Sequence, residues 1–237
     1  MFEQVNKVLN AQNKTLIDLD EMTSSKFIAD FKKIILDYNF LPSGLSYNQD
    51  KPKITVLIFT YRGDEGLTPI CVEFAKETLG PDTKIVAADD GFNAMYQPMQ
   101  EKLISMGVDY CQTDWPRCGN LLGPDHLKGA CKLMAELAKD CDIIVKLDPD
   151  ACILKRDWID RLWADKNATM TASYKIKLNY PMGNSYALKS VVCEELAKDA
   201  ELYPGWVDCF EDYEVGMRIS RIAKGDTKHA IRYVKCK

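Results

Sequence analysis

The sequence lacks several patterns by which proteins of this size are commonly classified. Its 237 residues contain neither a G-x-G-x-x-G stretch nor a G-x-x-x-x-G-K stretch, which argues against the dinucleotide-binding and P-loop classes. There are only two histidines, and no two of the nine cysteines form a C-x-x-C pair, so no spacing supports a structural zinc site. No apolar run approaches the length of a membrane span. The chemistry of this chain must therefore come from other side chains.

A secretory signal is also missing. The chain opens Met-Phe-Glu-Gln-Val-Asn, which has neither a basic region nor an apolar region of the kind that directs export. Many cysteines without such a signal are typical of reduced thiols. We therefore expect a cytoplasmic protein whose cysteines are mostly small core residues.

Excess positive charge is missing from the chain as a whole but present at one end. The net charge of −4 implies no general attraction to nucleic acid or to an anionic membrane, and the hydrophobic content of 46% is that of a globular protein. The last twenty residues, however, contain a single acid, Asp226, beside seven basic residues: Arg218, Arg221, Lys224, Lys228, Arg232, Lys235 and Lys237. Such a cluster is more often solvated, but it keeps DNA open as a partner.

Two parts of the chain differ in pattern. Residues 1–50 carry helical apolar spacing and end in turn-rich sequence, which predicts a helical appendage with a role in packing or in forming a homo-oligomer. From residue 51 to residue 237 strands and helices alternate. Strands are predicted at 54–61, 84–88 and 108–111 and in the apolar run before Asp148. Helices are predicted from the N-cap Thr68 and Pro69 to Gly80, near 97–106, and from the N-cap Asp125 to about Ala138. This alternation predicts an α/β fold with a mostly parallel central sheet and helices on both faces.

The pattern is less regular after Asp150. A helix is predicted at 157–164, a strand at 168–174, a turn at 181–186 and a helix at 189–198. A further helix follows the acid pair Glu211-Asp212, and a last strand is predicted at 230–234.

The buried run at 143–147 ends in Asp148-Pro149-Asp150. Acids at the carboxyl end of a parallel strand project into the region where open α/β sheets bind ligands. Two carboxylates separated by one residue offer hard oxygen donors, which suit Mg²⁺ or Mn²⁺ ions that also hold substrate phosphates. Taken alone, the same sequence is more often a solvated turn.

The order of several motifs resembles that of a known family. A strand ending Thr60-Tyr61-Arg62 comes first, then a strand ending Asp89-Asp90-Gly91, a Gly/Asn loop with a basic helix, Asp148-Pro149-Asp150, Met182-Gly183-Asn184, and Glu211-Asp212. This order resembles the nucleotide-sugar glycosyltransferases of the GT-A (Rossmann-like) fold, family 2 type, over roughly residues 53–222. The first strand departs from the family in ending Thr-Tyr-Arg rather than Tyr-Asn.

The resemblance implies a role for each matching residue. The donor nucleotide would lie against Thr60, Tyr61, Arg62, Asp89, Asp90, Lys128 and Asp148. Of these, Asp89 or Asp90 would bind the base, and Lys128 would bind the phosphates or the sugar. Mn²⁺ or Mg²⁺ would be bound chiefly by Asp150, with Asp148 nearer the ribose and His229 as a further ligand. Gly183, Asn184 and Trp206 would lie near the donor sugar or the acceptor. Asp212 would be the general base, with Glu211 beside it.

The function implied is transfer of one sugar from a nucleoside-diphosphate sugar, UDP-sugar as first choice, to an acceptor hydroxyl. Inversion through a single base is the expected outcome, and the acceptor expected is a saccharide or a lipid-linked saccharide. Three alternatives stay open. They are a DNA glycosyltransferase acting on a hydroxylated base, a sugar-1-phosphate nucleotidyltransferase, and a non-catalytic nucleotide- or carbohydrate-binding module.

Overall fold

The structure, a computed structural model, describes residues 51–115, 123–174, 181–203, 211–223 and 231–234. The helices predicted in residues 1–50 lie outside these ranges, so the appendage and the boundary at residue 51 remain predictions.

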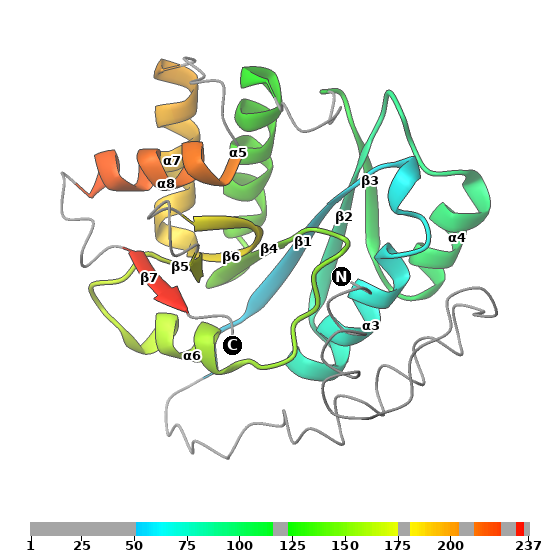
Figure 1. Ribbon diagram of the computed structural model, residues 1–237, viewed down its shortest axis with the longest axis horizontal. Helices are drawn as coiled ribbons and strands as arrows, with labels where there is room; N and C mark the ends of the chain where they lie inside the picture. The colour runs from blue at the N-terminus through cyan, green and yellow to red at the C-terminus, as the bar shows by residue number, and fades with distance from the viewer. Residues whose placement is uncertain (1–50, 116–122, 175–180, 204–210, 224–230, 235–237) are drawn as a thin grey trace, which may run out of the picture. The chain divides into compact units, whose positions relative to one another are not determined.

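A mixed sheet forms the centre of the described chain (Figure 1). Its seven strands have the order β3-β2-β1-β4-β6-β5-β7. Strands β3, β2, β1 and β4 are parallel to one another, β6 is antiparallel to β4 and to β5, and β7 is parallel to β5. The strands are β1 (Ile54–Thr60), β2 (Lys84–Asp90), β3 (Asp109–Thr113), β4 (Ile143–Leu147), β5 (Met170–Tyr174), β6 (Pro181–Lys189) and β7 (Ile231–Val234).

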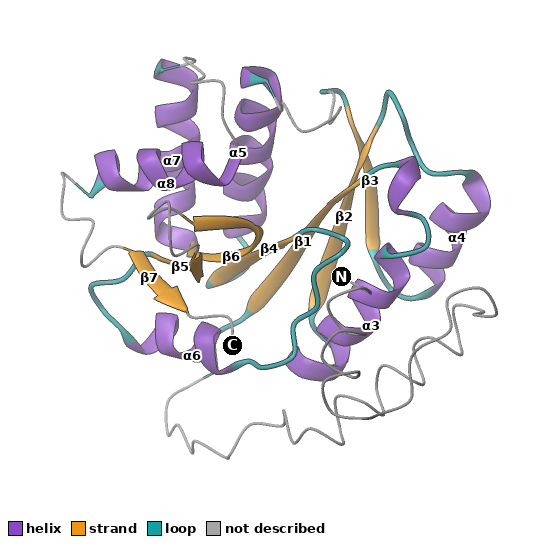
Figure 2. Cartoon of the chain, in the orientation of Figure 1, coloured by secondary structure: helices purple, strands orange, loops and turns teal. Residues whose placement is uncertain are grey.

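Helices cover both faces of this sheet (Figure 2). Helices α5 (Pro124–Ala138), α7 (Ser190–Leu202) and α8 (Glu211–Ile222) pack on one face. Helices α3 (Thr68–Leu79), α4 (Gln97–Ser105) and α6 (Asp157–Ala164) pack on the other, and a short 3-10 turn, η1 (Arg62–Asp64), follows β1. The predicted α/β fold, with a mostly parallel sheet between two helical layers, is confirmed.

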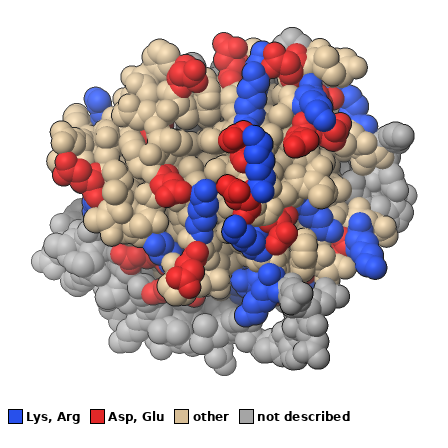
Figure 3. All heavy atoms as spheres, turned by 180° about the vertical axis from the view of Figure 1, so that it is seen from behind, with Lys and Arg blue, Asp and Glu red and all other residues tan. Residues whose placement is uncertain are grey.

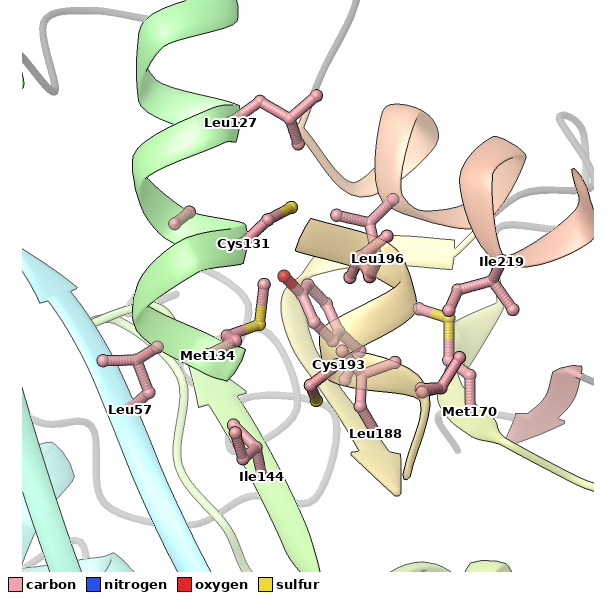
Figure 4. Close-up of a cluster of buried hydrophobic side chains, with 14 of the residues drawn as sticks. Leu57, Leu127, Cys131, Met134, Ile144, Met170, Leu188, Cys193, Leu196 and Ile219 are labelled. Atoms are coloured by element: carbon pink, nitrogen blue, oxygen red, sulfur yellow. The ribbon is translucent and has the colours of Figure 1, made fainter. Parts of the chain in front are cut away.

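Each face of the sheet contributes its own hydrophobic core because strand side chains alternate between faces. In β1, Leu57 and Phe59 point toward α5, α7 and α8, whereas Val56 and Ile58 point toward α3, α4 and α6. Figure 4 shows side chains of the first core converging from β1, α5, β4, β5, β6, α7 and α8: Leu57, Leu127, Cys131, Met134, Ile144, Met170, Leu188, Cys193, Leu196 and Ile219. Strands β1, β2 and β4 are buried on both faces, which is why their sequences are mostly apolar runs, whereas the edge strand β3 is partly exposed and more polar.

Two local predictions are wrong. The turn predicted at 181–186 is the beginning of β6, because Pro181 occupies the first strand position and the pairing with β5 shifts register at Ala172/Ser173. The N-cap of α3 is Leu67 rather than Thr68, whose hydroxyl instead donates to the Asp64 carbonyl at 3.0 Å.

Candidate functional site

The strands that end in the predicted site residues end at the same edge of the sheet. In β1 and β2, Thr60 lies opposite Asp89, and β4 beside β1 places Leu147 opposite Ile58. Residues 61–62, 89–90 and 148–150 therefore all lie at or just beyond the carboxyl ends of the central parallel strands. This is the edge at which open α/β sheets bind ligands.

The end of β1 is held by its neighbours in the chain. Thr60 is fully buried, and its hydroxyl lies 3.0 Å from the Thr68 hydroxyl at the start of α3; its predicted place beside the donor nucleotide remains a prediction. Tyr61 is partly exposed, and its backbone N–H donates to the Asp64 carboxylate at 3.3 Å. A Cβ added at Gly63 would lie 2.6 Å from atoms of the Tyr61 side chain, so this ring packs against the η1 backbone.

Arg62 joins the loop after β1 to the loop after β2, at residues 91–96. Its backbone N–H donates to the Asn93 carbonyl at 2.9 Å, and its Nε donates to the Ala94 carbonyl at 3.1 Å. Its guanidinium lies 4.5 Å from the centroid of the Tyr96 ring, at cation–π distance. The two loops thus form one connected rim, along which Tyr61 and Tyr96 are exposed.

Asp89 is fully buried beneath this rim. Its Oδ2 accepts a hydrogen bond from the Met95 backbone N–H at 2.8 Å and another from the Tyr110 hydroxyl, whereas its Oδ1 has no hydrogen-bond partner among the described residues. Burial is the largest cause of the raised pKa of Asp89. Burial, followed by the bond to Asp89, also raises the pKa of Tyr110. An unused acceptor in such a place is costly unless something donates to it.

Asp90 is buried as well but belongs to the opposite face of the sheet. Strand alternation places it with Val86 and Ala88 on the α5 side, while Asp89 lies with Ala87 on the α3 side. Its Oδ1 accepts a hydrogen bond from the Phe92 backbone N–H at 2.9 Å. Asp89 and Asp90 therefore lie on opposite faces of the sheet, and each accepts a hydrogen bond from the backbone of the 91–96 loop.

Asp148 is paired with a lysine that the sequence reading did not single out. The Lys146 ammonium lies 2.8 Å from Asp148 Oδ1, and the two side chains are 3% and 28% exposed. Both project to the α5 side because they stand two residues apart at the end of β4. A lone charged residue inside an apolar strand, with an acid two positions later, was the signal available in the sequence.

Asp150 differs from Asp148 in being exposed, and within the described part of the chain its carboxylate makes no hydrogen bond or ion pair. No group of three or more His, Cys, Asp or Glu side chains among the described residues could enclose a metal ion. Two carboxylates at an open edge fit Mg²⁺ or Mn²⁺, which keep several waters and bind substrate phosphates in the remaining positions. The donor set is therefore compatible with such an ion.

Two thiols lie close beneath the acid pair. Burial raises the pKa of Cys71 well above its ordinary value, and Cys152, Asp148 and Asp150 raise it further. Burial, followed by Asp150, raises the pKa of Cys152 to about 12. Both thiols are therefore protonated at neutral pH, and neither offers a thiolate nucleophile.

Lys128, predicted to face phosphates or sugar, lies on α5 and pairs with α7. Its ammonium is 2.7 Å from the Glu201 carboxylate, which also binds Lys132 at 3.1 Å. Lys128 would have to leave Glu201 to reach a diphosphate.

The remaining predicted residues are only partly described. Gly183 and Asn184 lie in β6, and Glu211 and Asp212 begin α8, but nothing beyond their backbone is described. Trp206 and His229 lie outside the described residues. The assigned roles of all six therefore remain predictions.

Helix α8 is fixed to α7 by a buried charge network that the sequence did not reveal. Arg218 donates to the Asp199 carboxylate at 2.8 Å and to the Tyr203 carbonyl at 2.9 Å, and is only 2% exposed. Arg221 also donates to Asp199, at 3.1 Å. These are the two members of the basic C-terminal cluster whose side chains are described, and both bind this acid.

The surface of the described chain has mixed charge where it can be seen. Figure 3 shows Lys and Arg side chains interspersed with Asp and Glu side chains over one face. Among the described residues, no helix has both the length and the apolar character needed to cross a membrane.

The chain is similar in structure to several solved proteins. A mannosyltransferase from Pyrobaculum calidifontis, in complex with GDP-Man and Mn²⁺, matches with a TM-score of 0.55 and 13% identity, over 99% of this chain and 67% of that one. Glucosyl-3-phosphoglycerate synthase from Mycobacterium tuberculosis, with Mn²⁺, UDP-glucose and phosphoglyceric acid, matches with 0.49 and 14%, over 78% and 70%. A cytidylyltransferase from Leptospira borgpetersenii matches with 0.47 and 14%, over 79% and 77%.

No protein-family model matches the sequence, and no curated protein matches it. At 13% identity, the match to the mannosyltransferase shows only the fold, which is of the GT-A type. The matches to the synthase and the cytidylyltransferase, with TM-scores below 0.5, add no further argument.

Proposed function

We propose that this protein is a metal-dependent glycosyltransferase. It would transfer a single sugar from a nucleoside-diphosphate sugar, with a UDP-sugar as first choice, to the hydroxyl of a saccharide or lipid-linked saccharide. The mannosyltransferase that shares its fold was solved with a nucleotide sugar and Mn²⁺, which supports this choice of reaction and of metal.

One observation carries the proposal. Asp89, a buried acid with an unused acceptor oxygen, lies at the carboxyl end of β2, and the partly exposed Asp148 and the exposed Asp150 follow β4; these two strands flank β1. Neighbouring strands are about 4.8 Å apart, so the ends of β2 and β4 are separated by about 10 Å. A nucleoside diphosphate can bridge that distance with its base at one strand end and its diphosphate at the other.

The acceptor oxygen also bears on the choice of base. Asp89 Oδ2 already binds Met95 and Tyr110, so only Oδ1 is left to receive a donor. A single acceptor suits uracil, which offers one ring N–H, better than guanine, which offers two adjacent donors. Because Asp89 is fully buried, this contact requires a shift of the 91–96 loop that covers it.

The chemistry expected of the site is electrostatic. A divalent ion bound there would stabilise the negative charge that develops on the departing diphosphate. Asp150, with Asp148 beside it, would hold this ion, and the rim of Tyr61 and Arg62 would lie against the donor's base and ribose. Asp212, at the start of α8, would take the proton from the acceptor hydroxyl, a step typically worth a factor of about 10²–10⁴ in rate.

A panel of nucleotide sugars tested for thermal stabilisation in the presence of Mn²⁺ tests this function. A bound donor raises the apparent stability by mass action, by about 2.7 kcal/mol at a concentration of 100 Kd. We expect UDP-sugars to raise the melting temperature, and Mn²⁺ to be needed for the rise. If no nucleoside-diphosphate sugar stabilises the protein at any metal concentration, the proposal is wrong.

Two variants separate binding from transfer. Asp150→Ala is expected to abolish Mn²⁺-dependent donor binding, because it removes the exposed carboxylate. Asp212→Asn is expected to bind the donor normally and to lose at least about 100-fold in transfer rate, because it removes the base. Calorimetric titration with donor and Mn²⁺ measures the first effect, and release of the nucleoside diphosphate in the presence of acceptor measures the second. Unchanged transfer by Asp212→Asn would sink the base assignment.

The other candidate functions have less support in the described residues. A sugar-1-phosphate nucleotidyltransferase needs basic residues in the loop after β1, but there Asp64 and Glu65 accept hydrogen bonds from the backbone of Tyr61 and Tyr96. For DNA, the described basic side chains near the C-terminus bind Asp199.

A further inference from the structure

Tyr110 reaches from β3 to the buried acid at the end of β2. It stands opposite Ala87 in the pairing of the two strands, so its side chain lies on the same face of the sheet as Ala87 and Asp89, toward α3. The ring is partly buried against the hydrophobic core of that face, and the hydroxyl donates a hydrogen bond to Asp89 Oδ2. Tyr110 therefore occupies one of the two oxygens of the buried carboxylate.

The second donor to Asp89 Oδ2 is held in a different way. It is the backbone N–H of Met95, at 2.8 Å, which belongs to the 91–96 loop that covers Asp89. A base can reach Asp89 only if this loop shifts, and the shift moves Met95 as well. Tyr110 stays in place, because β3 is paired with β2 as far as Thr113 opposite Asp90. When the loop has shifted, Tyr110 is therefore the residue that still occupies Oδ2.

An occupied Oδ2 limits the bases that Asp89 can bind. Oδ1, which has no donor among the described residues, is left for a single N–H group. Uracil presents one ring N–H between two carbonyls, whereas guanine presents two adjacent donors, the ring N1–H and the 2-amino group. With Tyr110 on Oδ2, the second guanine donor meets a hydroxyl hydrogen instead of a lone pair, and a buried donor without a partner is costly.

We propose that Tyr110 is a specificity-determining residue, which makes the site selective for uracil over guanine by keeping Asp89 Oδ2 occupied. The base is then bound through Oδ1 alone. The inference rests on the proposed function in its choice of a nucleoside diphosphate as ligand. Tyr110 takes no part in the transfer step, because it acts on the base through Asp89.

Calorimetric titration of the full chain with UDP and with GDP, each in the presence of Mn²⁺, tests the inference. We expect wild type to bind UDP at least about tenfold more tightly than GDP. Tyr110→Phe keeps the ring against the core and frees Oδ2, so we expect it to reduce this preference at least about tenfold through tighter GDP binding. A wild type without a preference for UDP would overturn the inference, and so would a Tyr110→Phe variant with the wild-type preference.

Tyr203→Phe is the matched control. Tyr203 is a tyrosine more than half exposed at the end of α7, on the other face of the sheet, where its ring lies 4.7 Å from the Arg221 guanidinium. The substitution removes the same hydroxyl group at a position that does not contact Asp89, so the preference for UDP should stay as in wild type. A change as large as that of Tyr110→Phe would overturn the inference, because the effect would then not depend on Asp89.

A comparison of two purine nucleotides on wild type covers the case in which Tyr110→Phe does not fold. Inosine diphosphate carries the ring N1–H of GDP but lacks its 2-amino group. Because Tyr110 leaves that amino group without an acceptor, we expect inosine diphosphate to bind wild type at least about threefold more tightly than GDP. In Tyr110→Phe the order should reverse. A wild type that binds GDP as tightly as inosine diphosphate would contradict the inference.

The two proposals can fail separately. If the base preference depends on Tyr110 as expected but no sugar is transferred from any nucleotide sugar, the role of Tyr110 stands and the glycosyltransferase assignment falls. If a sugar is transferred but Tyr110→Phe leaves the base preference unchanged, the reverse holds.

Discussion

At the scale of the residue, Asp89 carries an electrostatic cost. Its carboxylate is enclosed under the 91–96 loop. Oδ2 accepts two hydrogen bonds, whereas Oδ1 has no donor among the described residues. Burial raises its pKa from 3.8, so the charged form destabilises the fold relative to the unfolded chain, where water solvates it. A ligand that donates a hydrogen bond to Oδ1 would offset part of this cost.

This cost predicts a pH dependence of stability. The folded state holds the Asp89 proton at pH values where the unfolded chain has already released it. The stability contribution is therefore fully present below pH 3.8 and is lost as pH rises through the raised pKa, by about 1.4 kcal/mol for each unit of the shift. Asp89→Asn should lack this loss while its amide oxygen still accepts from Met95 and Tyr110.

Urea unfolding of wild type and Asp89→Asn between pH 4 and pH 7 checks the prediction. The stability of wild type relative to the variant should fall as pH rises. A difference that stays constant across this range would contradict it. Titration with UDP supplies a second measurement, since loss of the Oδ1 acceptor should weaken nucleotide affinity.

Sequence reasoning located the acids but not their partners. Asp89, Asp148 and Asp150 were found because each follows an apolar run, and the structure places all three at one edge of the sheet. Tyr110 and Lys146 were missed because their contacts depend on which neighbouring strand faces them. That Thr60 points into the start of α3 was equally invisible, because it depends on packing between elements.

At the scale of the element, α8 is the part of the site with the most unusual support. Its first residues include Asp212, and its middle is fixed to α7 by Arg218, which reaches Asp199 and the Tyr203 carbonyl. Glu214 adds an oxygen 3.6 Å from the same guanidinium. This helix is thus held by charge as well as by the apolar contacts of Val215 and Ile219.

Arg218→Met should destabilise the protein strongly. It leaves the nearly buried Asp199 carboxylate dependent on Arg221, and removing one member of a buried ion pair typically costs about 3–5 kcal/mol. Arg221→Met is the matched control, because Arg221 is about half exposed and its loss should cost about 1 kcal/mol or less. Denaturant unfolding measures both. Equal losses for the two variants would mean that the network is not centred on Arg218.

Element boundaries were predicted well where one pattern dominated. The helix at 157–164 has the predicted bounds, and the apolar run before Asp148 is a strand as predicted. The start of β6 was missed because Pro181, Gly183 and Asn184 are typical turn residues, and only pairing with β5 on one side and β4 on the other makes them a strand. The antiparallel return of β6 beside β4 is a tertiary fact with no local signature.

At the scale of the whole molecule, the described sheet and both of its helical layers lie within residues 51–234. We therefore expect a chain of residues 51–237 to fold cooperatively and to keep the affinity of the full chain for nucleotide. If residues 1–50 form the predicted oligomerisation element, sedimentation should give a smaller assembly for the shorter chain. A shorter chain that is unfolded by circular dichroism would contradict the predicted domain boundary.

The position of β4 also has a consequence for the order of folding. The register joins Ile54 to Ile143, so β4 can pair with β1 only after a long loop of chain has closed, whereas β1, β2 and β3 are near neighbours in sequence. The half of the sheet that carries Asp89 should consequently form before the half that carries Asp148 and Lys146. A refolding chain would pass through a stage with one half of the site complete, and a ligand that spans β2 and β4 would slow unfolding without accelerating folding.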